Sequence, residues 1–93
     1  MRIIGNIEHP HLKITVFKMD GRVSVKFENT LYEQTFKLGD DERLATMEAV
    51  EKFVDRPMLD AVLDNFQQMH RTRMAALSRA FPEAEAYVFE EII

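Results

Sequence analysis

The sequence contains no cysteine and no tryptophan, and only three of its 93 residues are glycine. Without cysteine the chain has no disulfide framework, no thiolate metal site, no iron–sulfur cluster and no cysteine nucleophile. Three glycines cannot build a phosphate-binding loop, and the common nucleotide-binding, nucleophile-elbow and zinc-protease motifs are missing. These absences exclude the enzyme classes that those motifs define, and we expect that the chain needs no cofactor to fold.

Long apolar segments are also missing. No segment approaches the roughly 20 apolar residues that span a membrane, and a polar residue interrupts residues 1–6 before an apolar signal segment can develop. We therefore expect a cytoplasmic protein without membrane contact. A net charge of only −4, 46% hydrophobic residues and seven phenylalanines exclude a disordered chain.

The length predicts a single domain over residues 1–93. Within it we expect a β-meander in residues 1–38, two helices in residues 40–81 and a C-terminal segment in residues 82–93.

Apolar and polar residues alternate on both sides of Asp20-Gly21. An Asp-Gly pair between two such segments indicates a β-hairpin, because both central residues of its type I′ turn need a positive φ. A two-residue turn pairs apolar residues on one face and opposite charges on the other: Val16 with Val25, Ile14 with Phe27, and Lys13 with Glu28.

A second hairpin is predicted around Asn29-Thr30, and a two-residue turn there places Tyr32 opposite Phe27. Residues 2–8 form a further strand that puts Ile3 and Ile7 on the same apolar face. The prediction is a four-stranded antiparallel meander, and another layer must cover its apolar face.

The covering layer is helical, because the apolar spacing after residue 40 changes from two to about 3.6. Thr46 is predicted to cap a first helix and Asp55 a second, since a side-chain oxygen at this position accepts a hydrogen bond from an unpaired backbone N–H. Pro57 is tolerated in the first turn, and Pro82 ends the second helix, which covers residues 56–81. The sequence therefore predicts an α+β domain with two α-helices packed on one face of a four-stranded antiparallel β-meander.

The second helix is longer than the sheet beneath it. At 1.5 Å per residue it measures about 39 Å, whereas a seven-residue strand spans about 24 Å. Its end must bury its apolar stripe against the C-terminal segment or against a second subunit. For residues 83–93 we expect extended structure, although a last helix is the alternative.

Two histidines flank a proline in His9-Pro10-His11. His-x-His pairs bind zinc or copper, but this spacing supplies only two ligands. A third ligand from His70 or a carboxylate would be needed. The alternatives are a solvated turn and a hydrogen bond from a histidine that shapes the loop.

A second group of polar residues falls on predicted interior faces. His70 interrupts the apolar stripe of the long helix, and Tyr32 and Gln34 point from the sheet toward the same layer. A neutral imidazole suits proton transfer near neutral pH, and a buried amide needs hydrogen-bond partners. These residues predict a ligand pocket between sheet and helices, unless His70 and Gln34 lie at its rim.

The outer face of the predicted sheet mixes basic with apolar residues. We expect Ile4, Phe17, Met19 and Leu31 on it, and Phe81 at the end of the long helix. Single-stranded RNA binders stack bases on such a face, but the single aromatic residue there and an isoelectric point of 5.3 disfavour nucleic acid. The same apolar residues suit a dimer interface.

The segments Gly5-Asn6-Ile7-Glu8-His9-Pro10-His11-Leu12-Lys13-Ile14-Thr15-Val16-Phe17-Lys18-Met19 and Leu31-Tyr32-Glu33-Gln34-Thr35 resemble a small family of proteins from anaerobic Bacteroides- and Porphyromonas-type bacteria. The resemblance extends over most of the chain. It implies a cytoplasmic bacterial protein. The family carries no assigned activity or site residues to transfer.

Two functions remain open at this point. The leading hypothesis is a non-enzymatic interaction or structural module that forms a homodimer. The alternative is a small-ligand-binding or catalytic domain that uses His70, Gln34 and Tyr32, or a weak metal site at His9 and His11.

Overall fold

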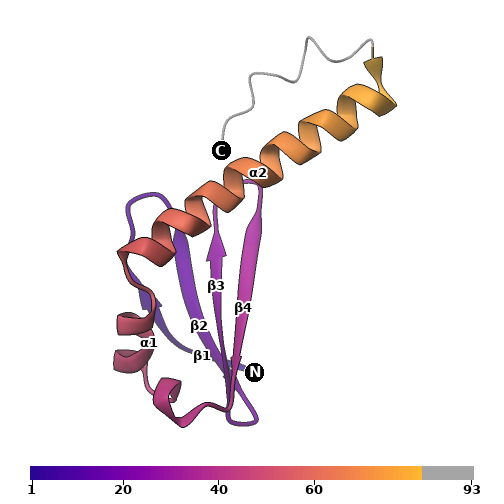
Figure 1. The fold of residues 1–93 in the computed structure, drawn as a ribbon. Coiled ribbons are helices and arrows are strands. Elements are labelled where there is room, and N and C mark those ends of the chain that lie inside the picture. Colours follow the sequence, from indigo (N-terminus) through magenta and orange to yellow (C-terminus); the bar gives the residue numbers. More distant parts are fainter. Residues whose placement is uncertain (83–93) are drawn as a thin grey trace.

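The N-terminal half forms an antiparallel sheet in the computed structural model, which describes residues 1–82. Its strands lie side by side in chain order: β1 (Arg2–Ile7), β2 (Lys13–Met19), β3 (Arg22–Glu28) and β4 (Glu33–Gly39). The chain continues into the helical elements η1 (Glu42–Leu44), α1 (Met47–Phe53) and α2 (Arg56–Ala80). The predicted α+β fold is confirmed, with the α-helices following a four-stranded antiparallel meander (Figure 1).

The first hairpin has the predicted turn and the predicted register. Asp20 and Gly21 both have positive φ, 53° and 76°, as a type I′ turn requires. Val16 lies opposite Val25, and the remaining pairs of β2 with β3 follow the same register. The turn residues and the alternation therefore agree on which face is buried.

The second turn is longer than predicted. The side chain of Asn29 accepts hydrogen bonds from the backbone N–H groups of Leu31 (2.9 Å) and Tyr32 (2.8 Å), which stabilises a loop over residues 29–32. Gln34 therefore lies opposite Phe27, and the predicted pairing of Tyr32 with Phe27 is wrong. The shift is two residues, so each strand residue keeps its predicted face.

The register of β1 shifts between Ile3 and Gly5. Such a bulge adds one residue to a strand and reverses the alternation beyond it. Ile4 and Ile7 pack against the core, whereas Ile3 lies opposite Phe17 and is 60% exposed. The predictions that placed Ile3 on the inner face and Ile4 on the outer face are therefore wrong.

Both helix caps form where the sequence predicts them. The hydroxyl of Thr46 accepts a hydrogen bond from the N–H of Ala49 (3.2 Å), and the carboxylate of Asp55 accepts one from Met58 (3.0 Å). Each bond satisfies a backbone donor that the first turn of a helix leaves unpaired. The second helix ends at Ala80, one residue before the predicted end.

The start of α1 comes very close to β1. A Cβ atom placed on Gly5 would lie 2.6 Å from the Sδ atom of Met47, which is closer than a Cβ atom approaches an atom to which it is not bonded. The absence of a side chain at Gly5 thus lets the first turn of α1 lie on the sheet.

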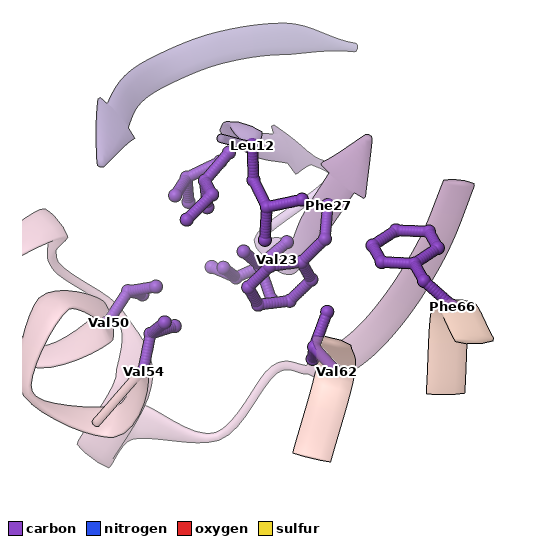
Figure 2. Packing of buried hydrophobic residues seen from close by; sticks show 10 residues of the cluster. Leu12, Val23, Phe27, Val50, Val54, Val62 and Phe66 are labelled. Atoms are coloured by element: carbon purple, nitrogen blue, oxygen red, sulfur yellow. The ribbon is translucent and has the colours of Figure 1, made fainter. Parts of the chain in front are cut away.

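The core lies between the sheet and the helices (Figure 2). Val50 and Val54 from the α1 region, and Val62 and Phe66 from α2, point toward Phe27 and its neighbours in the sheet. Within residues 1–82 the buried apolar residues all belong to one cluster: Leu12, Ile14, Val16, Val23, Val25, Phe27, Val50, Val54, Val62 and Phe66.

The second half of α2 extends past the strands, as the lengths predict (Figure 1). The helix crosses above the strand ends and leaves the sheet on the side of β4. Within residues 1–82 no helix is both long and apolar enough to cross a membrane. The prediction of extended structure for residues 83–93 lies outside the described part of the chain.

Candidate functional site

The structure brings Tyr32 and His70 together. The phenolic oxygen of Tyr32, just before β4, lies 3.1 Å from Nδ1 of His70 in the middle of α2. The two rings meet edge to face, with their centroids 6.1 Å apart. Both residues are half-buried, so this hydrogen bond joins the helix to the loop that precedes the edge strand.

Gln34 lies beside this pair and also bonds to α2. Its amide nitrogen donates to the carbonyl oxygen of Val62 (2.9 Å), and its amide oxygen accepts from the side chain of Asn65 (3.2 Å). The half-buried amide therefore has protein partners for both of its ends. The sequence singled out Gln34, but neither partner could be found without the packing of α2 on β4.

The three predicted pocket residues thus form a polar seam, the row of hydrogen bonds from Tyr32 and Gln34 to α2. These bonds orient the helix across the edge of the sheet. A ligand that used these groups would first have to displace contacts within the chain.

The two turn histidines are joined by a hydrogen bond between the ring of His9 and the backbone of His11. Nδ1 of His9 accepts a hydrogen bond from the N–H of His11 (3.1 Å), and the ring centroids lie 6.0 Å apart. This bond supports the interpretation that His9 shapes the loop. Residues 1–82 contain no group of three or more His, Asp or Glu side chains arranged to hold a metal ion.

The outer face of the sheet is hollowed near the turn between β2 and β3. The hollow has a volume of about 820 Å³, and its lining includes Phe17, Met19, Arg22, Ser24, Lys26 and Lys37. The ammonium group of Lys26 lies 5.3 Å from the centre of the Phe17 ring and 3.6 Å from a carboxylate oxygen of Glu28. Met19 is 54% exposed.

Two further interface candidates lie away from this face. Leu31 is half-buried in the loop before β4 and not in a strand, because the second turn is longer, and its part in an interface stays a prediction. Phe81 is the C-cap of α2, where its N–H donates to the carbonyl oxygen of Leu77 and its side chain is 59% exposed.

Sequence reasoning missed Thr15, which is only 2% exposed although it lies on the outer face. It sits between Asn6 of β1 and Lys26 of β3. Its hydroxyl is buried and has no hydrogen-bond partner within residues 1–82. The position of Thr15 in the middle of a central strand was the available signal.

Asp41 and Arg43 form an exposed ion pair at the start of η1. Their closest atoms, Oδ2 and Nη2, lie 2.6 Å apart, and Oδ1 also accepts from the backbone N–H of Arg43. The side-chain hydrogen bond from Arg43, followed by the backbone bond, lowers the pKa of Asp41 to about 2. This pair caps a single turn, and neither group takes part in the hydrogen bonds of the polar seam.

The fold and these contacts define a class of protein, a small α+β domain in which two helices cover one face of an antiparallel meander. A comparison of the chain with protein-family models, with curated proteins and with solved structures finds no match. The resemblance to a family from Bacteroides- and Porphyromonas-type bacteria therefore stays a prediction.

Proposed function

We propose that this chain is a non-enzymatic interaction module that associates with a second copy of itself. The observation that carries this proposal is the overhang, by which we mean residues 71–81 at the end of α2. These residues continue about 15 Å beyond His70, where the polar seam ends, and they rise clear of the strands (Figure 1).

The overhang keeps the apolar stripe of the helix. Met74, Leu77 and Phe81 follow Phe66 and His70 at steps of three or four, which places them on the side that packs on the sheet earlier in the helix. The side chain of Phe81 is 59% exposed. Burying an exposed phenylalanine side chain contributes about 2 kcal/mol, so a partner at the overhang has a clear source of affinity.

The outer face of the sheet offers a second apolar surface. Ile3 and Met19 are 60% and 54% exposed, and Phe17 is half-buried beside them. Apolar side chains surrounded by charged ones are typical of the core and rim of a protein interface.

A ligand-binding role is the second candidate, and the hollow on the outer face favours it. Phe17 supplies an apolar wall around a volume of about 820 Å³. The cations of Arg22, Lys26 and Lys37 outnumber the carboxylates of Asp20 and Asp40 in the lining by one. This arrangement suits a small anion with an apolar part. The hollow replaces the predicted pocket at the polar seam as the location for such a ligand.

Native mass spectrometry of the gently purified protein tests both candidates. A species at twice the mass of the 10.9 kDa chain without added mass supports the interaction module, whereas a reproducible adduct supports the ligand-binding role. A wild-type protein that stays monomeric in this spectrum, and in sedimentation velocity at high concentration, contradicts the proposal.

Two variants then locate the interface. We expect Phe81→Glu and Phe17→Glu to shift the mass toward the monomer while the circular dichroism spectrum stays that of the folded protein. Ala75→Glu is the matched control, because it adds the same charge on the exposed side of the overhang opposite Leu77. If both test variants keep the wild-type mass, the overhang and the outer face are not the interface.

A further inference from the structure

The two edges of the sheet differ in how they could accept another strand. β1 and β4 are the edge strands. The register of β1 shifts between Ile3 and Gly5, and a bulge of this kind hinders pairing at an edge. The register of β4 also shifts, but only at its end, between Lys37 and Gly39. From Glu33 to Lys37 it pairs with β3 without a shift, over five residues against three from Gly5 to Ile7 in β1, so this segment presents a regular row of backbone donors and acceptors on its other side.

No strand within residues 1–82 pairs with that side of β4. The side chains that β4 places on the outer face of the sheet are those of Glu33, Thr35 and Lys37, and all three are exposed. An acid and a base placed symmetrically about a central threonine make the strand complementary to its own reversed copy. An antiparallel copy centred on Thr35 sets Glu33 opposite Lys37 twice, once on each side of the two-fold axis.

This register is specific. Paired residues must share a face, so the outward residues of β4 can also meet as Thr35 with Lys37, Thr35 with Glu33, or each charge with itself. Those registers leave the charges without opposite partners or place like charges together, which destabilises a strand pair. The register centred on Thr35 alone pairs Glu33 with Lys37.

The isolated chain also carries an unfavourable pair at this edge. Glu33 lies directly opposite Glu28 of β3, and like charges in this position repel. Nζ of Lys26 lies 3.6 Å from Oε1 of Glu28 and offsets part of the negative charge of this glutamate pair. In the register centred on Thr35, Lys37 of a second copy comes beside Glu33 and offsets the rest.

The long helix directs a second copy to the same edge. Gln34 of β4 bonds to Val62, and Tyr32 just before β4 bonds to His70, so α2 crosses the sheet at this strand. Figure 1 shows the overhang continuing past the β4 side. A copy seated on β4 therefore lies on the side toward which the overhang extends.

We propose that a second copy of this chain pairs with β4 as an antiparallel edge strand, with Thr35 on the two-fold axis and Glu33 opposite Lys37. The two sheets then form one continuous eight-stranded sheet. This inference rests on the proposed self-association and places its contact strand at β4, beside the overhang. Phe17 lies on β2, two strands away, so the Phe17→Glu variant tests the outer face as a different interface.

Charge exchange tests the register. Glu33→Lys sets lysine opposite Lys37, and Lys37→Glu sets glutamate opposite Glu33, so each variant alone places two like-charge pairs in the dimer. We expect each to weaken dimerisation by about tenfold or more, as measured by sedimentation. Mixing the two variants restores opposite charges in every pair, and the double variant Glu33→Lys with Lys37→Glu does the same, so both should regain the wild-type dissociation constant.

These variants leave the monomer folded for a physical reason. Glu33→Lys removes the repulsion from Glu28, and Lys37 lies opposite the neutral Ser24. A thermal unfolding curve for each variant confirms that a loss of dimer is not a loss of fold.

A single introduced cysteine tests the two-fold axis. The chain has no cysteine, so Thr35→Cys supplies the only thiol. Directly opposite Cα atoms in an antiparallel pair lie about 4.5–5.5 Å apart, within the range of roughly 4.4–6.8 Å for a disulfide. Mild oxidation should link two copies through position 35, whereas Thr30→Cys, an exposed control outside the paired segment, should link far more slowly.

The outcomes separate this inference from the proposed function. A wild-type monomer overturns both. If the wild-type protein is a dimer and the charge-exchange variants have the same dissociation constant as the wild type, the β4 interface is wrong. The same holds if the Thr35→Cys and Thr30→Cys variants cross-link equally. In either case the chain associates with itself through another surface. Recovery on mixing together with selective cross-linking at position 35 supports the interface.

Discussion

The hydroxyl of Tyr32 lies 3.1 Å from Nδ1 of His70, 38 positions later in the chain. This contact fixes the long helix to the loop that leads into the edge strand. Two residues whose chemistry suggested a ligand pocket are thereby bonded to each other. The direction of α2 beyond His70, and with it the overhang, depends on this contact and on the neighbouring bonds of Gln34.

Replacing Tyr32 by phenylalanine tests the strength of this contact. Tyr32→Phe keeps the ring and removes the hydroxyl, so we expect the free energy of unfolding to fall by about 1 kcal/mol in urea denaturation. In a His70→Leu background the same change should cost much less, because the partner is already gone. An equal cost in both backgrounds would show that the two groups do not interact.

Replacing Thr15 is expected to change the free energy of unfolding in the opposite direction. A buried hydroxyl without a partner lowers stability, so Thr15→Val should leave the free energy of unfolding unchanged or raise it by up to about 1 kcal/mol. Thr35→Val, at an exposed position of β4, is the control for a general effect of valine in strands. A clear loss of stability in Thr15→Val alone would mean that the hydroxyl has a bonding partner.

A side chain at Gly5 is expected to displace the side chain of Met47. Because a Cβ atom would lie 2.6 Å from Sδ of Met47, and a methionine side chain can move aside, Gly5→Ala should lower the free energy of unfolding by only about 1 kcal/mol. Met47→Ala removes the obstruction at its own cost in packing. The double variant should therefore lose less than the sum of the single variants, and strictly additive losses would count against this contact.

Because Asp41 is paired with Arg43, its carboxyl group is expected to titrate at an unusually low pH. The pKa of Asp41 is lowered from 3.8 to about 2, so the carboxylate should stay ionised in NMR spectra down to that pH. A group with a lowered pKa in the folded state contributes stability above its unfolded pKa, and this contribution disappears as the pH falls from about 4 through about 2.

Substitution of Arg43 checks the cause of the lowered pKa. Arg43→Ala removes the side-chain bond, which is the largest cause, and should raise the midpoint of Asp41 toward 3.8. The backbone N–H at position 43 still bonds to Asp41, so part of the lowering should remain. Arg56→Ala is the control, and an equal change in the Asp41 midpoint in both variants would contradict the assignment to Arg43.

Several features of the fold follow from neighbouring residues in the sequence. The turn at Asp20-Gly21 depends on two residues that tolerate positive φ, and the caps at Thr46 and Asp55 depend on a side chain within three positions of its backbone partner. Alternation with a period of two and a later spacing of about 3.6 separate strands from helices. All of these signals are local, and the first turn, both caps and the sequence of strands and helices are confirmed. The alternation failed only where it met the bulge of β1 and the longer second turn.

The sequence predicted which residues belong to the candidate site but not which of them bond to each other. The alternation placed Tyr32 and Gln34 on the face toward the helices, and the helical stripe placed His70 there as well. Nothing in the spacing indicated that Tyr32 would bond to His70 or Gln34 to Val62. Those bonds depend on the angle at which α2 crosses the sheet.

Local patterning by itself determined the strands, the first turn, the helix caps and the overhang of the long helix. The tertiary structure alone decided the bulge that turns Ile4 inward, the four-residue loop capped by Asn29, and the burial of Thr15. The physical reason is the range of the interactions. Turns, caps and periodicity are set by residues a few positions apart, whereas the strand register and the polar seam are set by groups that meet only when the sheet and the helices pack together.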